Sequence, residues 1–128
     1  IDMEIKKTGK LFSFCCMAPA IIKKKNLREI SFFEKIGANI GLLFQIADDL
    51  IDHKVKSDVA GKKTGKDKKK GKATLISLLG YENAIKYSEK IKTKIINDLK
   101  KYGSSSKNIN ETLNYILTRN QWLKTTNF

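Results

Sequence analysis

Apolar residues recur along much of the chain every three or four positions, the spacing that gathers side chains on one face of an α-helix. The strongest pattern predicts a long helix that ends at Asp52, with its apolar face at Phe32, Phe33, Ile36, Ile40, Leu43, Phe44, Ala47, Leu50 and Ile51. Asn26 is a candidate N-cap with Glu29 at the capping-box position, and Ser31 with Glu34 repeats that pattern slightly later. The helix therefore begins at one of these two caps.

A shorter pattern precedes it and predicts a helix from Asp2 to about Pro19. Proline lacks an N–H and crowds the preceding turn, so this helix can pass Pro19 only with a kink. One further turn to Ile22 is compatible with the sequence, and three consecutive lysines would then end the helix. Gly37 and Gly41 lie four apart on the long helix, where they would let a neighbouring helix or a ligand approach the backbone closely.

The second half of the chain predicts more helices separated by polar segments. Residues 55–71 hold three glycines and seven lysines and indicate a loop. A short apolar helix follows over 73–79, and then an amphipathic helix over 81–101, with its stripe at Ala84, Ile85, Tyr87, Ser88, Ile91, Ile95 and Leu99. Residues 103–106 close that helix, and a last helix over 108–123 uses Ile109, Leu113, Ile116 and Leu117. Since no segment alternates as a strand does, the predicted class is all-α.

The composition of the chain indicates which partners and which cellular location to expect. The net charge of +13, from 26 Lys and Arg against 13 Asp and Glu, makes a polyanionic partner worth considering. No apolar run approaches membrane-spanning length, because Ser13 and Pro19 interrupt Phe12–Ile22, so we expect no membrane span. Charged residues precede any apolar core at the N-terminus, which is unlike a signal peptide. Cys15 and Cys16 are adjacent and cannot readily pair, which favours buried or semi-buried thiols in a reducing compartment and a cytoplasmic location.

Three acids mark the chemically informative stretch. Asp48, Asp49 and Asp52 stand at the predicted helix end, where negative charge opposes the helix dipole by a few tenths to ~1 kcal/mol each. The repulsion between clustered carboxylates must be compensated, and the usual partner is a hard divalent cation bound by their oxygen atoms. Gln45 lies one turn earlier, and lysines with glycines over 61–67 could bind phosphate. The stretch predicts a site for a metal-bound phosphorylated ligand.

The order of these motifs resembles the second aspartate-rich region of trans-isoprenyl diphosphate synthases. The matching motifs are Phe44-Gln45-x-x-Asp48-Asp49-x-x-Asp52, Gly61-Lys62-x-x-Gly65-x-Asp67 and Gly71-Lys72-x-Thr74. Further similarities are Lys7-Thr8-Gly9, Leu78-Leu79-Gly80 with Ala84, and Tyr115-Ile116-x-x-Arg119-Asn120, the last being similar to the bacterial farnesyl/geranylgeranyl type. The resemblance implies an isoprenoid-synthase helical bundle around a deep cavity. It also implies a prenyltransferase that ionises an allylic diphosphate, condenses it with isopentenyl diphosphate and eliminates a proton.

The resemblance also implies roles for individual residues. Asp48 would ligate Mg²⁺, with Asp49 and Asp52 ligating or orienting metal-bound water. Lys7, Lys62 and Lys72 would bind the allylic diphosphate. Lys7 would also act in catalysis with Thr8 and Gln45, whose oxygen dipoles would face the allylic cation. For Thr8 and Gln45, ordinary interhelical hydrogen bonds are an open alternative.

The chain departs from the family pattern in one respect, because the first aspartate-rich motif is absent. We therefore expect residues 1–128 to be the C-terminal half of one all-helical synthase domain, inactive alone, with the isopentenyl diphosphate site in the preceding half. Full-length family members imply a homodimer. Two alternatives are a non-catalytic subunit of a heteromeric synthase and a basic helical nucleic-acid-binding module. Acids beside the basic loop would repel nucleic acid, and no aromatic residues interleave with its lysines, so no nucleic-acid partner is expected.

Overall fold

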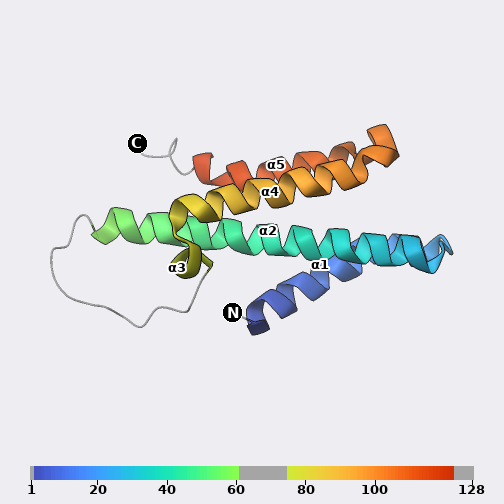
Figure 1. The fold of residues 1–128 in the computed structure, drawn as a ribbon, viewed down its shortest axis with the longest axis horizontal. Helices are drawn as coiled ribbons and strands as arrows, with labels where there is room; N and C mark the ends of the chain where they lie inside the picture. The colour runs from blue at the N-terminus through green and yellow to red at the C-terminus, as the bar shows by residue number, and fades with distance from the viewer. Residues whose placement is uncertain (1, 61–74, 123–128) are drawn as a thin grey trace.

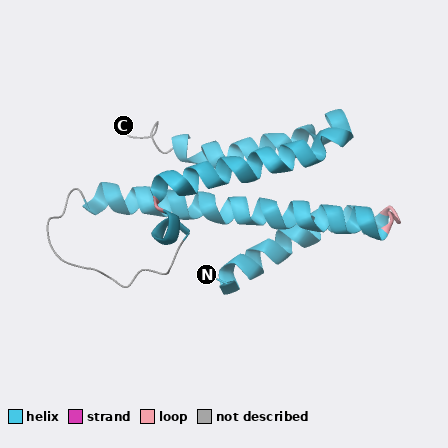
Figure 2. Ribbon diagram, in the orientation of Figure 1, coloured by secondary structure: helices cyan, strands magenta, loops and turns pink. Residues whose placement is uncertain are grey.

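The computed structural model describes residues 2–60 and 75–122, which are helical apart from short turns and contain no strand (Figures 1 and 2). The elements are α1 (Asp2–Ile22), α2 (Leu27–Ala60), α3 (Leu75–Leu79), α4 (Tyr81–Leu99), the 3₁₀ helix η1 (Lys100–Ser106) and α5 (Lys107–Trp122). In Figure 1, α2 runs through the middle, with α1 on one side and the α4–α5 hairpin on the other. The all-α prediction is confirmed for the described residues.

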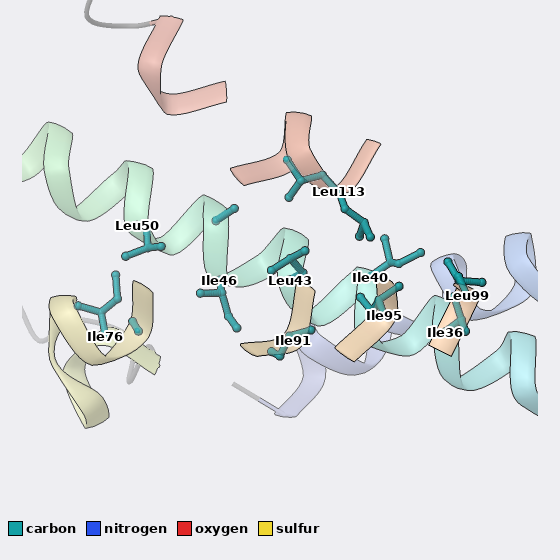
Figure 3. Packing of buried hydrophobic residues seen from close by; sticks show 13 residues of the cluster. Ile36, Ile40, Leu43, Ile46, Leu50, Ile76, Ile91, Ile95, Leu99 and Leu113 are labelled. Atoms are coloured by element: carbon teal, nitrogen blue, oxygen red, sulfur yellow. The ribbon is translucent and has the colours of Figure 1, made fainter. Parts of the chain in front are cut away.

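The hydrophobic core follows the predicted stripe of α2. Its buried members come from α2, α3, α4 and α5 (Figure 3): Ile36, Ile40, Leu43, Ile46, Ala47, Leu50, Ile76, Ala84, Ile91, Ile95, Leu99, Leu113 and Ile116. Each buried Leu or Ile side chain contributes roughly 1.5–3 kcal/mol relative to an exposed one. Because α2 packs against α1, α3, α4 and α5, it is the element on which the others are positioned. The prediction that Tyr87 belongs to the apolar stripe of α4 is wrong, since this residue is 39% exposed.

The turn between α1 and α2 uses local hydrogen bonds at both helix ends. The backbone N–H of Glu29 donates to the Asn26 side-chain oxygen at 2.9 Å, which confirms Asn26 rather than Ser31 as the N-cap. At the end of α1, Lys24 has a positive φ of 52° and the Lys25 N–H donates to the Ala20 carbonyl at 2.9 Å. These features define a Schellman motif in which a lysine takes the position usually held by glycine.

The helix crossing of α1 and α2 depends on the two glycines that the sequence singled out. A Cβ placed on Gly37 would lie 2.4 Å from the carbonyl oxygen of Phe12, and one on Gly41 would lie 2.9 Å from the Gly9 Cα. Both distances are shorter than real Cβ contacts, so only glycine permits the observed approach. The predicted close backbone approach is confirmed, and the neighbour is a helix.

Helix α2 is longer than predicted, which changes one argument about the acids. It continues through residues 55–60, which the sequence assigned to a loop, so Asp52 is two turns from the helix end. The helix dipole acts mainly within the last turn. The argument that the acids oppose the dipole is therefore wrong, although their clustering remains. Helix α4 ends at Leu99 and passes into η1, where Gly103 (φ 55°) breaks the helix.

Two further predictions are refined by the structure. Helix α1 includes Pro19 and continues to Ile22. The prediction of buried or semi-buried thiols is wrong for Cys15, which is exposed, and confirmed for Cys16, which is partly buried; both thiols are free. Burial and the neighbouring Cys15 raise the pKa of the Cys16 thiol. His53 is exposed, and its ring stacks on Tyr81 at a centroid distance of 5.4 Å.

One helix is longer and more apolar than the sequence analysis expected. By length and composition alone, Leu27–Lys56 of α2 could cross a membrane, with a mean hydropathy of 1.2 over an 18-residue window. The statement that no apolar run approaches spanning length is therefore wrong. A core helix passes the same test, and 39% of that window is buried inside the bundle. The expectation of no membrane span stays a prediction.

Candidate functional site

The site begins where α1 meets α2. Gly9 packs directly on Gly41, and Gln45 stands one turn further along the same face of α2. The backbone of Lys7 and Thr8 immediately precedes that contact, so the crossing brings the predicted Lys-Thr pair to the same stretch of α2 as Gln45. Thr8 and Gln45 are both partly buried. The structure therefore supports the expected proximity of these segments, and the roles of Lys7, Thr8 and Gln45 stay predictions.

The acids continue along α2 from Gln45. Asp48 and Asp49 are partly buried and Asp52 is exposed. Asp48 and Asp52 lie one helical turn apart on one side of α2. The three predicted metal ligands thus stand on one helix just beyond the glycine crossing, as the spacing predicts.

Arg119 is the residue whose role the sequence did not predict. From α5, its Nη2 donates to the Asp48 Oδ1 in an ion pair and also to the Phe44 carbonyl oxygen at 3.4 Å. The guanidinium carbon sits 4.4 Å from the centre of the Phe44 ring, a cation–π contact. The Arg119 side chain is 19% exposed and that of Asp48 43% exposed. Arg119 is therefore the enclosed partner and Asp48 the accessible one.

Phe44 links three helices at this point. Its ring lies 5.5 Å from the ring of Phe12 on α1 and also carries the Arg119 guanidinium from α5. The Nε of Arg119 is buried and has no hydrogen-bond partner in the described part of the chain. A buried donor without an acceptor costs about 1–3 kcal/mol, so the guanidinium is incompletely satisfied by Asp48 and Phe44.

The predicted diphosphate-binding lysines Lys62 and Lys72 lie outside the described residues, as do the motif positions Gly65 and Asp67. The side chain of Lys7 is also outside the description, although its backbone belongs to α1. These three assignments stay predictions.

The fit of the site to a metal ion depends on its donor chemistry. Within residues 2–60 and 75–122, no three His, Cys, Asp or Glu side chains lie close enough together to hold a metal ion. The donors on this face of α2 are nevertheless hard carboxylate oxygens, the type that Mg²⁺ prefers. Arg119 engages one oxygen of Asp48, while a carboxylate can accept several further contacts. The donor chemistry therefore fits part of a magnesium site, and Mg²⁺ binding by these acids stays a prediction.

The chain is similar to known proteins of the family that its motifs resemble. A family model described as "Polyprenyl synthetase" matches residues 1–116. The chain is 33% identical over 119 residues to a farnesyl diphosphate synthase of Micrococcus luteus, covering 93% of this chain and 41% of that protein. It is also 33% identical over 119 residues to geranylgeranyl pyrophosphate synthase 4 of Arabidopsis thaliana, covering 92% of this chain and 32% of that protein.

A solved structure confirms the fold. The geranyltransferase of Helicobacter pylori 26695 superposes with a TM-score of 0.58 and 27% sequence identity, covering 91% of this chain and 37% of that one. The expected isoprenoid-synthase helical fold is therefore confirmed. The chain spans about two fifths or less of the length of these proteins.

Proposed function

The chain belongs to the polyprenyl synthetase family, and on that premise we propose that it forms the diphosphate-binding wall of a trans-prenyltransferase. The substrates would be an allylic diphosphate and isopentenyl diphosphate, as in farnesyl or geranylgeranyl diphosphate synthesis. The observation that carries the proposal is the glycine crossing, because it sets the Lys7-Thr8 backbone against the segment of α2 that leads through Gln45 to the acids.

The described residues have separate tasks in this proposal. Asp48, with Asp49 and Asp52, would hold Mg²⁺, which when bound neutralises charge that develops on the departing diphosphate. Thr8 and Gln45 would direct oxygen dipoles toward the positive charge of the allylic group, a form of electrostatic stabilisation. The lysines Lys7, Lys62 and Lys72 would bind diphosphate oxygens as point charges. Phe44 and Phe12 would keep α1 and α2 in register beneath these groups.

Diphosphate binding tests the proposal directly. Titration of the intact protein with inorganic pyrophosphate should show binding that requires Mg²⁺ and is lost in Asp48→Ala. Asp98→Ala is a matched control, because Asp98 is a carboxylate on α4 whose partner is Lys94 at 2.6 Å, and it should bind as the unchanged protein does. Binding that persists without Mg²⁺ or survives Asp48→Ala would contradict the proposed role of the acids.

The same preparation separates the alternatives. Affinity for duplex DNA that falls steeply with salt would support the nucleic-acid-binding module instead. Mg²⁺-dependent pyrophosphate binding without prenyl transfer by the intact protein would support a non-catalytic subunit. The 128-residue chain by itself should incorporate no radiolabelled isopentenyl diphosphate with dimethylallyl diphosphate and Mg²⁺, and incorporation would refute its expected inactivity. We further expect a homodimeric, cytoplasmic protein, which size-exclusion chromatography and cell fractionation would check.

A further inference from the structure

Arg119 lies beside the carboxylate to which a cation would bind. Its Nη2 is bonded to the Asp48 Oδ1, and a metal ion on the same carboxylate would lie within a few ångströms of the guanidinium. We propose, on the basis of the proposed function, that Arg119 is a positioning residue that makes cation binding at Asp48 depend on the diphosphate. In this proposal the guanidinium disfavours the bare metal ion and favours the metal–diphosphate complex.

The geometry keeps Arg119 in place when a ligand arrives. Three contacts hold its guanidinium, namely Asp48, the Phe44 carbonyl oxygen at 3.4 Å and the Phe44 ring at 4.4 Å. Only 19% of the side chain is exposed, so a move into solvent would break the cation–π contact and the hydrogen bonds together. A cation that binds Asp48 therefore meets a fixed positive charge.

The sign of the effect follows from simple electrostatics. A divalent cation about 5 Å from a fixed positive charge is disfavoured by roughly tenfold in affinity even in a water-like dielectric. A metal–pyrophosphate complex carries net negative charge, so the same guanidinium attracts it, and arginine is a strong donor to phosphate oxygens. One residue thus acts in opposite directions on the two ligands.

The experiment compares two substitutions that differ in charge. Arg119→Gln removes the charge and keeps an N–H donor, whereas Arg119→Lys keeps the charge. Mn²⁺ serves as a paramagnetic probe, and its binding to the intact protein is followed by electron paramagnetic resonance with and without inorganic pyrophosphate. We expect Arg119→Gln to bind bare Mn²⁺ about tenfold more tightly and Mn²⁺–pyrophosphate about tenfold more weakly, and Arg119→Lys to restore the original preference.

A double-mutant cycle assigns the effect to the ion pair. In an Asp48→Asn background, Arg119→Gln should no longer tighten bare Mn²⁺ binding. If Arg119→Gln changes both affinities in the same direction, or neither, the inference is wrong even though the site may bind diphosphate. If Asp48→Asn alone leaves Mn²⁺–pyrophosphate binding unchanged, the proposed function is wrong instead. If the role of Arg119 were purely structural, Arg119→Gln would lower the affinity for both ligands, and Arg119→Lys would not restore it.

Discussion

Helix α2 receives α1 and α5 in two different ways. Against α1 it presents glycines, and the contact is backbone against backbone, with Gly37 facing the Phe12 carbonyl. Against α5 it presents an acid and a ring, which Arg119 contacts through its charge. The first contact is steric and depends on the absence of a side chain, whereas the second depends on charge. Close packing therefore sets the position of the Lys-Thr backbone against α2, and a charge pair sets the surroundings of the acid.

The largest expected effect on stability comes from adding a methyl group where α1 and α2 touch. Gly37→Ala places a Cβ 2.4 Å from a backbone oxygen that cannot rotate away, so we expect a loss of about 2–4 kcal/mol in the free energy of unfolding. Urea denaturation followed by circular dichroism measures it. Gly9→Ala is the matched control, because its added Cβ meets nothing within 4 Å, and alanine should leave stability unchanged or raise it by up to about 1 kcal/mol. Equal losses in the two variants would contradict the steric interpretation.

A smaller effect is expected at the electrostatic contact. Arg119→Leu removes the ion pair and the cation–π contact, and we expect a loss of about 1 kcal/mol at low salt. Because salt screens a half-exposed pair, the loss should shrink in 1 M NaCl. Denaturation of this variant and of Gly37→Ala at both salt concentrations separates the two kinds of contact, since the steric penalty should not depend on salt. A salt-independent loss at Arg119 would show that packing dominates there.

The smallest effect concerns the turn that joins α1 to α2. Lys24 has a φ of 52°, a conformation that glycine adopts without strain. Lys24→Gly should therefore stabilise the protein by about 0.5–1 kcal/mol, measured as a rise in the thermal midpoint. Lys23→Gly is the control, because Lys23 has no positive φ and the change should not stabilise. A gain limited to Lys24 would show that the turn, unlike the crossing beside it, can still be improved.

The sequence predicted the steric contact well and the electrostatic one poorly. The stripe from Ile36 to Leu50 and the pair Gly37 and Gly41 are local, periodic signals, so they could be read from the chain. The continuation of α2 to Ala60 was missed because lysines and few apolar residues indicate a loop, although a helix can extend through them.

The partner of Asp48 could not be found by the same means. Arg119 lies 71 residues away, and no periodicity connects the two positions. It entered the sequence interpretation only as part of a motif on the last helix, with no contact assigned. The roles of Lys62 and Lys72 rest on resemblance alone, because both lie outside the described residues.

The separation of Arg119 from Asp48 also has a kinetic consequence. The helical hairpin of α1 and α2 closes a short loop, and local contacts of this kind form early in folding. The pair between α2 and α5 closes a loop of 71 residues, which costs more chain entropy. We expect pulsed hydrogen exchange to protect amides around Gly41 before those around Arg119, and the reverse order would refute this. The acid would then acquire its counter-charge only in the final docking of α5, so a chain still folding would present Asp48 as an unpaired carboxylate.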